Sequence, residues 1–442
     1  MDGSQETSVG TAPDGSTTAD DPAARQADKH PDRRASMLGT LHNRDYRLIL
    51  TGQLLSSIGT WLLLVAAPFF VFRLTGSTMA TGLSMAAETV PAVLLGPVAG
   101  VFVDRWDRRW TMIATDVLRA GAVLLLLLVQ TRGEVWIVYA ALALESAFGQ
   151  CFGPAQAALI PNLVGRGPEL SAANSLGQLV GGTIRLVGGP LGGVLFAVAG
   201  FRAVVTIDAA SYLASAYLIA MIRFRAIRAV RDTETARTDG KTGGAARLLS
   251  EDLRHGLGHL RRTPGIPMLC GVAAIFFAGN AILTALLVPY LGTVLNSGAQ
   301  SLGVLFGTLG VGFIIGAPAS RLVAGRLSDR TTIAASLGTL AAVFALTFNT
   351  PCLAGDVVLF ALIGPPATCF LVTADTSITR RTPDRLQGRV SSTYLALQSL
   401  ATLVGMVAGS LLGQQIGIVT TMDAAAVLIA VSAGAALLLP GS

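Results

Sequence analysis

Charged residues are scarce in this sequence. Only 13% of its 442 residues are Asp, Glu, Lys or Arg, whereas 52% are hydrophobic. An average soluble domain carries about 25% charged residues. The deficit extends over most of the chain, so it excludes one large aqueous core and favours apolar segments that face lipid.

Residues that carry metal or catalytic chemistry are also few. All four histidines lie in polar segments, so no set of nucleophile, histidine and acid can be assembled. No Gly-Lys-Ser/Thr phosphate loop occurs, which argues against an ATP-driven pump. The sequence therefore predicts no enzyme, no bound metal and no cofactor. The four cysteines have no metal-ligand spacing, and we interpret them as small hydrophobic residues without disulfides: Cys151, Cys270, Cys352 and Cys369.

Long apolar runs fill most of the chain. A run of about 20 apolar residues is long enough to cross a membrane as a helix. Twelve such runs occur, at 46–72, 78–103, 110–131, 135–160, 171–199, 203–223, 265–292, 299–325, 331–349, 354–378, 389–414 and 417–439. The expected fold is therefore an all-α membrane protein with twelve transmembrane helices.

The predicted spans form two six-helix halves, residues 41–225 and 263–442. Pro161–Arg166 follows the fourth span of the first half, and the similar stretch Pro383–Arg389 follows the fourth span of the second half, about 222 residues later. Six spans return the chain to the side on which it started, so the halves are a parallel duplication. Transporters with two rocking halves are built in this way.

Two polar segments flank the first half. Residues 1–40 are interpreted as a disordered tail, because the first 36 are rich in Ser, Thr, Asp, Gly and Pro and contain no apolar signal-peptide run. Residues 226–262 form a linker. Leucines at roughly helical spacing in its later part predict an amphipathic helix along the membrane surface.

The lysines and arginines predict the orientation. Of 32, 27 fall in the tail, the linker and the loops on one side of the predicted spans. Only Arg73, Arg132 and Arg202 fall on the other side. Basic residues mark the cytoplasmic side of membrane proteins, so both termini are expected in the cytoplasm. The excess of basic residues then serves to orient the protein during membrane insertion and to contact anionic lipid, and we expect no nucleic-acid partner.

The connection between the second and third spans is Gly100–Arg109. Its charges must lie outside lipid. It resembles the signature of the major facilitator superfamily between helices 2 and 3, with Asp107 in place of the usual glycine. That substitution is familiar in the branch similar to macrolide and siderophore (enterobactin-type) exporters. Further marks of the branch are Leu74–Ser77, Ala173–Leu176 and Asp208–Tyr212.

The resemblance implies a cytoplasmic gate. In the superfamily this motif locks helices in one state, so the expected gate residues are Gly100, Asp104, Arg105, Arg108 and Arg109. The alternative is that these charges only enforce orientation. The corresponding stretch of the second half, Gly316–Arg330, lacks the final basic pair. We therefore expect the first-half copy to be the stronger gate.

The fifth span resembles the glycine-rich motif of drug/proton antiporters, with one residue fewer after the proline. Its members are Gly188, Gly189, Pro190, Gly192 and Gly193. Small residues allow close helix approach, and proline permits a bend. Ordinary membrane packing is the competing explanation.

Ionisable residues inside the spans are costly and need a partner or a cavity. Glu88, Glu145, Arg185 and Asp208 meet this description. We hypothesise that Glu145 or Glu88 accepts a coupling proton and that Arg185 is its charge partner; a static ion pair is the alternative. Asp116 and Arg119 are assigned to the gate network.

By the architecture that the resemblance implies, spans 1, 4, 7 and 10 line a central cavity. An aromatic wall with few charges suits bulky, amphipathic compounds. Residues at this spacing can equally be core or lipid-facing. The candidates are Trp61, Tyr139, Phe148, Phe276, Asn280 and Phe370.

The sequence thus predicts a monomeric, multi-pass protein of a bacterial inner membrane. Its expected function is proton-coupled export of small amphipathic molecules such as drugs, antibiotics or siderophore-like metabolites. The proton gradient is the expected energy source. Import of a small nutrient and a non-transporting sensor on the same fold remain alternatives.

Overall fold

A computed structural model describes residues 37–103, 106–165, 167–222, 265–324, 326–350 and 352–439, and within these ranges all regular elements are helices. Residues 37–40, which the sequence analysis included in the tail, form the short helix α2. The predicted linker 226–262 lies outside the described residues. The longer helices are α3 (Arg44–Thr75), α4 (Thr78–Val103), α5 (Arg108–Leu124), α6 (Val135–Val164), α7 (Pro168–Ala220), α10 (Ile266–Thr293), α11 (Ala299–Ala324), α12 (Asp329–Asn349), α13 (Leu353–Arg380), α14 (Asp384–Gln415) and α15 (Ile418–Ala436).

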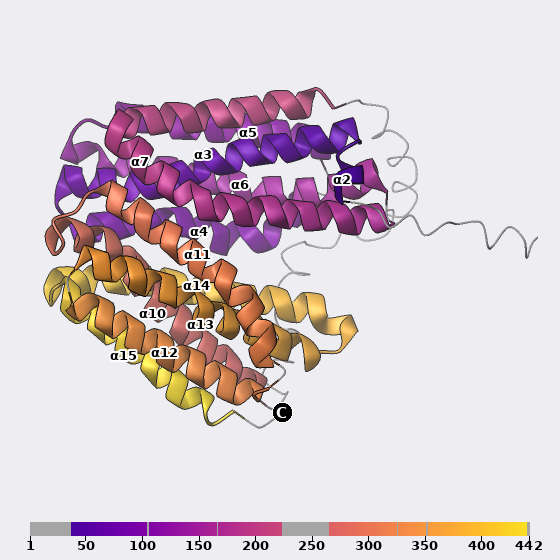
Figure 1. The fold of residues 1–442 in the computed structure, drawn as a ribbon. Coiled ribbons are helices and arrows are strands. Elements are labelled where there is room, and N and C mark those ends of the chain that lie inside the picture. Colours follow the sequence, from indigo (N-terminus) through magenta and orange to yellow (C-terminus); the bar gives the residue numbers. More distant parts are fainter. Residues whose placement is uncertain are drawn as a thin grey trace, which may run out of the picture.

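Eleven helices of the described part of the chain are long and apolar enough to cross a membrane. The longest, α7, contains two crossings, because Gly200 leaves the helical conformation with φ 78° and ψ 176°. This positive φ is readily available only to glycine, and the chain turns back there (Figure 1). The arms 168–199 and 201–220 are the predicted fifth and sixth spans. The twelve-span prediction is therefore confirmed.

The helices form two bundles (Figure 1). Helices α3 to α7 make the first half, in which α3 packs on α7, α4 on α6, and α5 on both α6 and α7. Helices α10 to α15 make the second half, in which α11 packs on α13, α10 on α14 and α15, and α12 on α13 and α15. Each bundle thus buries its own set of apolar faces, as expected for two halves that move against each other.

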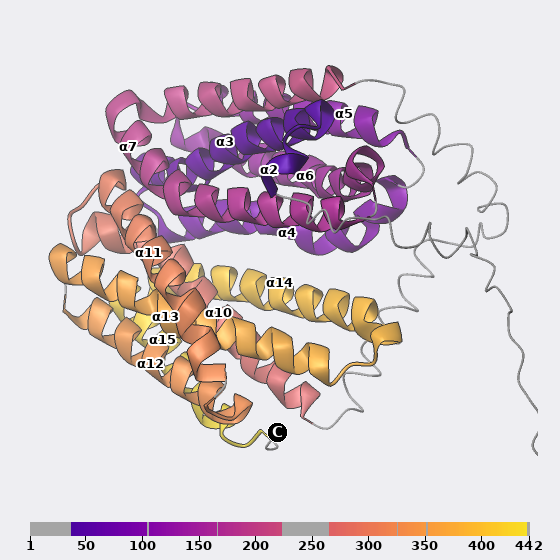
Figure 2. The ribbon, with the colours of Figure 1, turned by 45° about the vertical axis from the view of Figure 1, so that its right-hand side comes forward.

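The two halves converge at one end and diverge toward the other (Figure 2). Where they meet, α7 packs on α11 and α4 packs on α14. Thr89 of α4 donates a hydrogen bond to the sulfur of Met406 in α14, at 3.6 Å. The first turn of α10 and the last turns of α7 and α15 lie at the diverging end (Figures 1 and 2). That end also carries the Gly100–Arg109 connection.

Candidate functional site

A buried ion pair lies between α5 and α6 in the first half. Nε and Nη2 of Arg119 both donate to Oε1 of Glu145, at 3.0 and 2.5 Å. The Glu145 residue is only 4% exposed. Arg119 extends from α5 across to the middle of α6, where its guanidinium lies beside Gly149, one turn beyond Glu145. A charge-assisted bond of this kind is strong where water is excluded.

Two hydroxyl groups extend this ion pair into a hydrogen-bond network. The Tyr212 hydroxyl, on the second arm of α7, donates to Oε1 of Glu145 at 2.6 Å and accepts from Nη2 of Arg119 at 2.6 Å. Thr60 of α3 lies 2.7 Å from the same hydroxyl. The Arg119 guanidinium also lies over the Tyr212 ring, 4.1 Å from its centroid. One network therefore joins α3, α5, α6 and α7.

Three further carboxyl groups surround the network. Asp116, one turn before Arg119 on α5, has Oδ1 3.9 Å from Nη1 of that arginine. Asp208 lies one turn before Tyr212 and is completely buried. It packs so closely against α3 that a side chain at Gly59 would meet its Cα at 3.0 Å. Glu88 on α4 is within electrostatic range of both Glu145 and Arg119.

The charges of this cluster do not balance among the side chains that the structure describes. Four carboxyl groups, Glu88, Asp116, Glu145 and Asp208, share the single guanidinium of Arg119. A buried charge without a partner costs several kcal/mol. The arrangement is thus suited to binding positive charge, as a proton or as a cationic ligand. No three His, Cys, Asp or Glu side chains of the described residues are grouped as metal ligands.

The structure changes the assignment of Arg119 and leaves that of Arg185 a prediction. Arg119, which the sequence assigned to the gate network, is the partner of Glu145 in the bundle interior. Arg185 had been expected in that role; its backbone lies in α7, and its side chain is outside the described part. Tyr212 and Thr60 were not singled out. The only signal for Tyr212 was its place in the Asp208–Tyr212 motif.

Two arginines of the Gly100–Arg109 connection donate hydrogen bonds to other helices of the first half. Nη1 of Arg108 donates to the carbonyl of Ala158 in α6 at 3.2 Å. Arg109 donates to the carbonyls of Ile219, at 3.2 Å, and Ala220, the last residues of α7. Cations stabilise the C-terminal end of a helix in this way.

Asp107 has a structural reason to replace the glycine of the usual motif. Its carboxylate accepts a hydrogen bond from the backbone N–H of Trp110 at 3.1 Å and caps the start of α5. Aspartate is a preferred residue at this position. Gly100 lies in the last turn of α4, whereas Asp104 and Arg105 lie outside the described residues, so their gate role stays a prediction.

The glycine-rich motif of the fifth span packs against two helices, α3 on one face and α11 on the other. A side chain at Gly188 or Gly192 would approach Trp61 or Leu62 of α3. On the neighbouring face, a side chain at Gly193 would lie 3.1 Å from Gly303 of α11. Gly189 similarly faces Phe306, and Pro190 lies against Gly303 and Gly307 of α11. The motif therefore lets α7 approach the other half closely.

The cavity candidates fall into two groups. Phe276 and Phe370 are 5% and 0% exposed, and their rings pack 4.6 Å apart inside the second half. In this structure they are core residues. The others are partly buried, and Tyr139 donates from its hydroxyl to the carbonyl of Ala80 at 3.2 Å. The partly buried candidates are Trp61, Tyr139, Phe148 and Asn280.

Comparison with known proteins is consistent with this fold. A family model described as "Transmembrane secretion effector" matches residues 35–440. The chain is 26% identical over 385 residues to the MFS-type transporter YfiS of Bacillus subtilis, covering 84% of this chain and 87% of that protein. It is 25% identical over 384 residues to the multidrug efflux pump Tap of Mycolicibacterium fortuitum, covering 85% and 90%. It is 28% identical over 177 residues to macrolide efflux protein A of Streptococcus pyogenes, covering 40% and 44%.

A solved structure shares the fold at lower identity. The crystal structure of a bacterial homologue of the iron transporter ferroportin, in an inward-facing state, is similar with a TM-score of 0.71. The sequences are 18% identical, and the similarity covers 90% of this chain and 98% of that one. This likeness supports the two-bundle architecture.

Proposed function

The chain belongs to the transmembrane secretion effector family of major facilitator transporters, and we propose that it exports small amphipathic molecules from a bacterial cell in exchange for protons. Two of its relatives are named as efflux proteins, one for macrolides and one for multiple drugs. The observation that carries the proton coupling is the buried pair of Arg119 and Glu145, surrounded by further carboxyl groups.

A proton on Glu145 would change the network directly. The carboxylate accepts three hydrogen bonds from Arg119 and Tyr212. Protonation removes its charge and weakens the bonds to the guanidinium. Arg119 is then free to turn toward another carboxyl group. One such group is Asp116, whose Oδ1 lies 3.9 Å from Nη1 of Arg119. Because these groups lie on different helices, the proton changes how α5, α6 and α7 pack.

Alternating access supplies the transport step. The two halves are joined where α7 meets α11 and where α4 meets α14, and they diverge at the end that carries the Gly100–Arg109 connection (Figure 2). With the orientation that the basic residues favour, this end faces the cytoplasm. The structure then corresponds to a state loaded from inside. Rocking of the halves would expose the same site to the outside.

The Gly100–Arg109 connection is the proposed inner gate. Arg108 and Arg109 already hold it against α6 and α7, and Asp104 is the carboxylate that the superfamily resemblance assigns to the lock. Replacement of Asp104 by Asn should preserve insertion and reduce transport. Normal transport by Asp104→Asn would instead favour a role in orientation only.

The coupling is tested by adding a fluorescent lipophilic cation or a macrolide to the outside of proteoliposomes. An imposed pH gradient should drive accumulation by the unmodified protein, and Glu145→Gln should abolish the gradient-driven part. Glu169→Gln is the matched control, because Glu169 is exposed at the start of α7. Collapse of the pH gradient with an ionophore should have the same effect as Glu145→Gln.

Four outcomes would contradict the proposal. Full gradient-driven accumulation by both Glu145→Gln and Glu88→Gln would remove the coupling assignment. Transport indifferent to the gradient would exclude antiport. Accumulation only in the direction of proton flow would identify an importer. Binding of both the lipophilic cation and the macrolide without transport of either would identify a sensor.

A further inference from the structure

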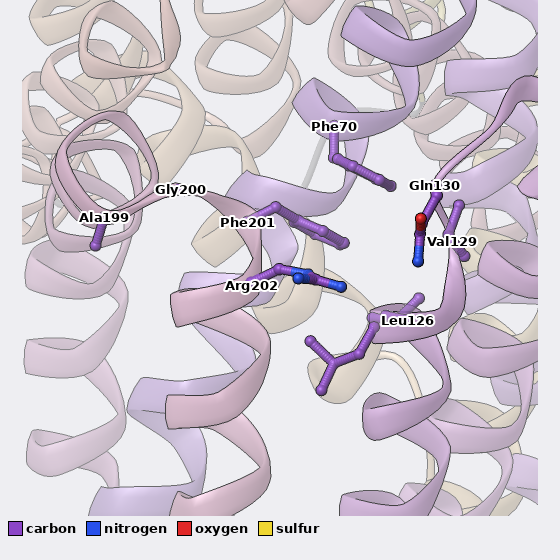
Figure 3. Close-up of a pocket in the computed structure, with 9 residues that line it drawn as sticks. Phe70, Leu126, Val129, Gln130, Ala199, Gly200, Phe201 and Arg202 are labelled. Carbon is purple, nitrogen blue, oxygen red and sulfur yellow. The ribbon is translucent and has the colours of Figure 1, made fainter.

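A pocket lies in the first half beside Gly200 (Figure 3). The reversal of α7 lies at the converging end of the two halves (Figure 1). Its volume is about 380 Å³. Phe70 of α3 and Phe201 of α7 form its aromatic wall, with ring centroids 3.9 Å apart and planes 5° from parallel. The 3₁₀ turn Leu125–Leu128, which ends the third span, supplies the facing apolar wall. The pocket exists because α7 reverses at Gly200 and leaves this corner unfilled.

One cation in the pocket has no described partner. Arg202 is exposed and extends between Phe201 and Leu126 (Figure 3), and its guanidinium forms no hydrogen bond or ion pair with another described residue. The other two arginines at this end are already engaged. Nε of Arg132 donates to the carbonyl of Leu74 at 2.8 Å, and Arg73 lies over the ring of Phe196 at 6.0 Å. Arg202 is therefore available to a ligand.

Among the described residues, no carboxylate forms an ion pair with Arg202. The stretch 186–207 contains no acidic residue. Glu134, which follows the third span, accepts hydrogen bonds from the backbone N–H groups of Gln130 and Thr131 at 2.7 and 2.9 Å. The amide of Gln130 lines the pocket as a second donor (Figure 3). The site is thus cationic and rich in donors above an apolar wall.

The depth of the pocket in the membrane indicates which class of ligand it binds. Arg202 is the second residue of the sixth span, and the Leu125–Leu128 turn is the end of the third. Both lie where the hydrocarbon layer ends, at the depth of lipid headgroups. A volume of about 380 Å³ is near the lower limit for a ligand site. It suits a headgroup and the first part of an acyl chain, with the remainder in the bilayer.

We infer that this pocket binds one anionic phospholipid from the leaflet that faces the converging end of the two halves. The lipid phosphate accepts hydrogen bonds from Arg202 and Gln130. The glycerol and upper methylenes lie along Leu126 and the Phe70–Phe201 pair. With the orientation proposed above, this is the outer leaflet. The site itself does not depend on that orientation or on the transported compound.

The test is native mass spectrometry of the full-length protein released from nanodiscs of phosphatidylethanolamine and phosphatidylglycerol. The unmodified protein should retain one phosphatidylglycerol. Arg202→Gln should weaken retention roughly tenfold to a hundredfold, as expected for loss of one charged hydrogen-bond partner. Arg73→Gln is the matched control, because it removes the same charge from the same end and should retain the lipid. Arg202→Lys should fall between the two.

A second substitution tests the apolar wall. Leu127→Trp, at a partly buried position that lines the pocket, fills the pocket and should also lower retention, while the protein remains monodisperse in detergent. If Arg202→Gln and Arg73→Gln lose lipid retention equally, general surface charge causes the retention. That result would overturn the proposal. Equal retention by Arg202→Gln and the unmodified protein would do so too. Displacement of the lipid by millimolar glycerol 3-phosphate would identify a soluble organophosphate site instead.

Discussion

Compared at one buried carboxyl group each, the two halves of this transporter differ. In the first half, Glu145 shares hydrogen bonds with Arg119 and Tyr212, and the network crosses four helices. In the second half, Asp356 is also completely buried, but neither of its carboxylate oxygens has a hydrogen-bond partner among the described residues. The first arrangement is the one to which we assign proton exchange in the proposed function. Asp356 has no hydrogen-bond partner among the described residues with which it could exchange a proton.

The centre of the second half is aromatic. Phe276 packs on Phe370 and on Phe277, with centroids 4.6 and 5.3 Å apart. Such contacts depend on shape and do not change with protonation. Among the described residues, the hydrogen-bonded ion network thus lies in one copy of the duplicated fold, and the other copy has an aromatic centre. The comparison predicts that substitutions in the first half alter coupling, while those in the second alter stability.

The largest effect is expected from Arg119→Gln. It leaves Glu145 and Asp116 without their shared cation, and breaking a buried pair costs about 3–5 kcal/mol. Gradient-driven transport should be lost and the melting temperature lowered. Proteoliposome uptake and thermal unfolding in detergent measure the two effects. Arg380→Gln, at an exposed position at the end of α13, should leave both unchanged.

Phe370→Ala should be nearly as destabilising but should act differently. Removal of a fully buried phenyl ring costs about 3–5 kcal/mol. The melting temperature should fall, while the remaining transport should keep its dependence on the pH gradient. Leu362→Ala on the same helix is the control, since Leu362 is 51% exposed. Loss of the gradient dependence in Phe370→Ala would contradict the division between the halves.

Tyr212→Phe removes one hydroxyl group from the ion network. Glu145 loses a donor and Arg119 loses an acceptor, which costs about 1–3 kcal/mol for buried groups. We expect slower gradient-driven transport at unchanged insertion. Tyr217→Phe on the same helix removes the same atom from a side chain that is 67% exposed. Equal rates for the two variants would mean that the hydroxyl of Tyr212 has no part in coupling.

The smallest effects concern the contact between the halves. Gly193→Ala places a methyl group against the backbone of α11 and should cost about 1–3 kcal/mol through overpacking. Gly181→Ala on the same helix meets nothing within 4 Å and should gain roughly 0.5–1 kcal/mol of helix stability. Thermal unfolding compares them. A similar loss in both would show that glycine flexibility, and not close approach, is needed in this helix.

Much of the fold could be predicted from the sequence. The predicted span 354–378 is α13 (Leu353–Arg380), and 299–325 is α11 (Ala299–Ala324). Hydrophobic length decides which segments cross a membrane, and it is read along the chain without knowing any contact. The turn at Gly200 was also expected, because a single arginine and a glycine separate two apolar runs there.

The partners inside the bundle could not be predicted in the same way. Arg119 and Glu145 are 26 residues apart on different helices, and their meeting depends on how α5 and α6 are rotated about their axes. Burial shows that a charged residue needs a partner, but it does not identify the partner. For this reason Arg119 was assigned to the gate and Tyr212 was not singled out.

The amino-acid sequence by itself determined the twelve crossings, the two halves and the charged residues that had to be enclosed. The tertiary structure alone decided that Arg119, Glu145 and Tyr212 form one network, that Phe276 and Phe370 are core, and that Gly193 approaches Gly303. Insertion into lipid depends on the composition of each segment separately. Pairing depends on the rotation and packing of helices against each other, which no segment specifies alone.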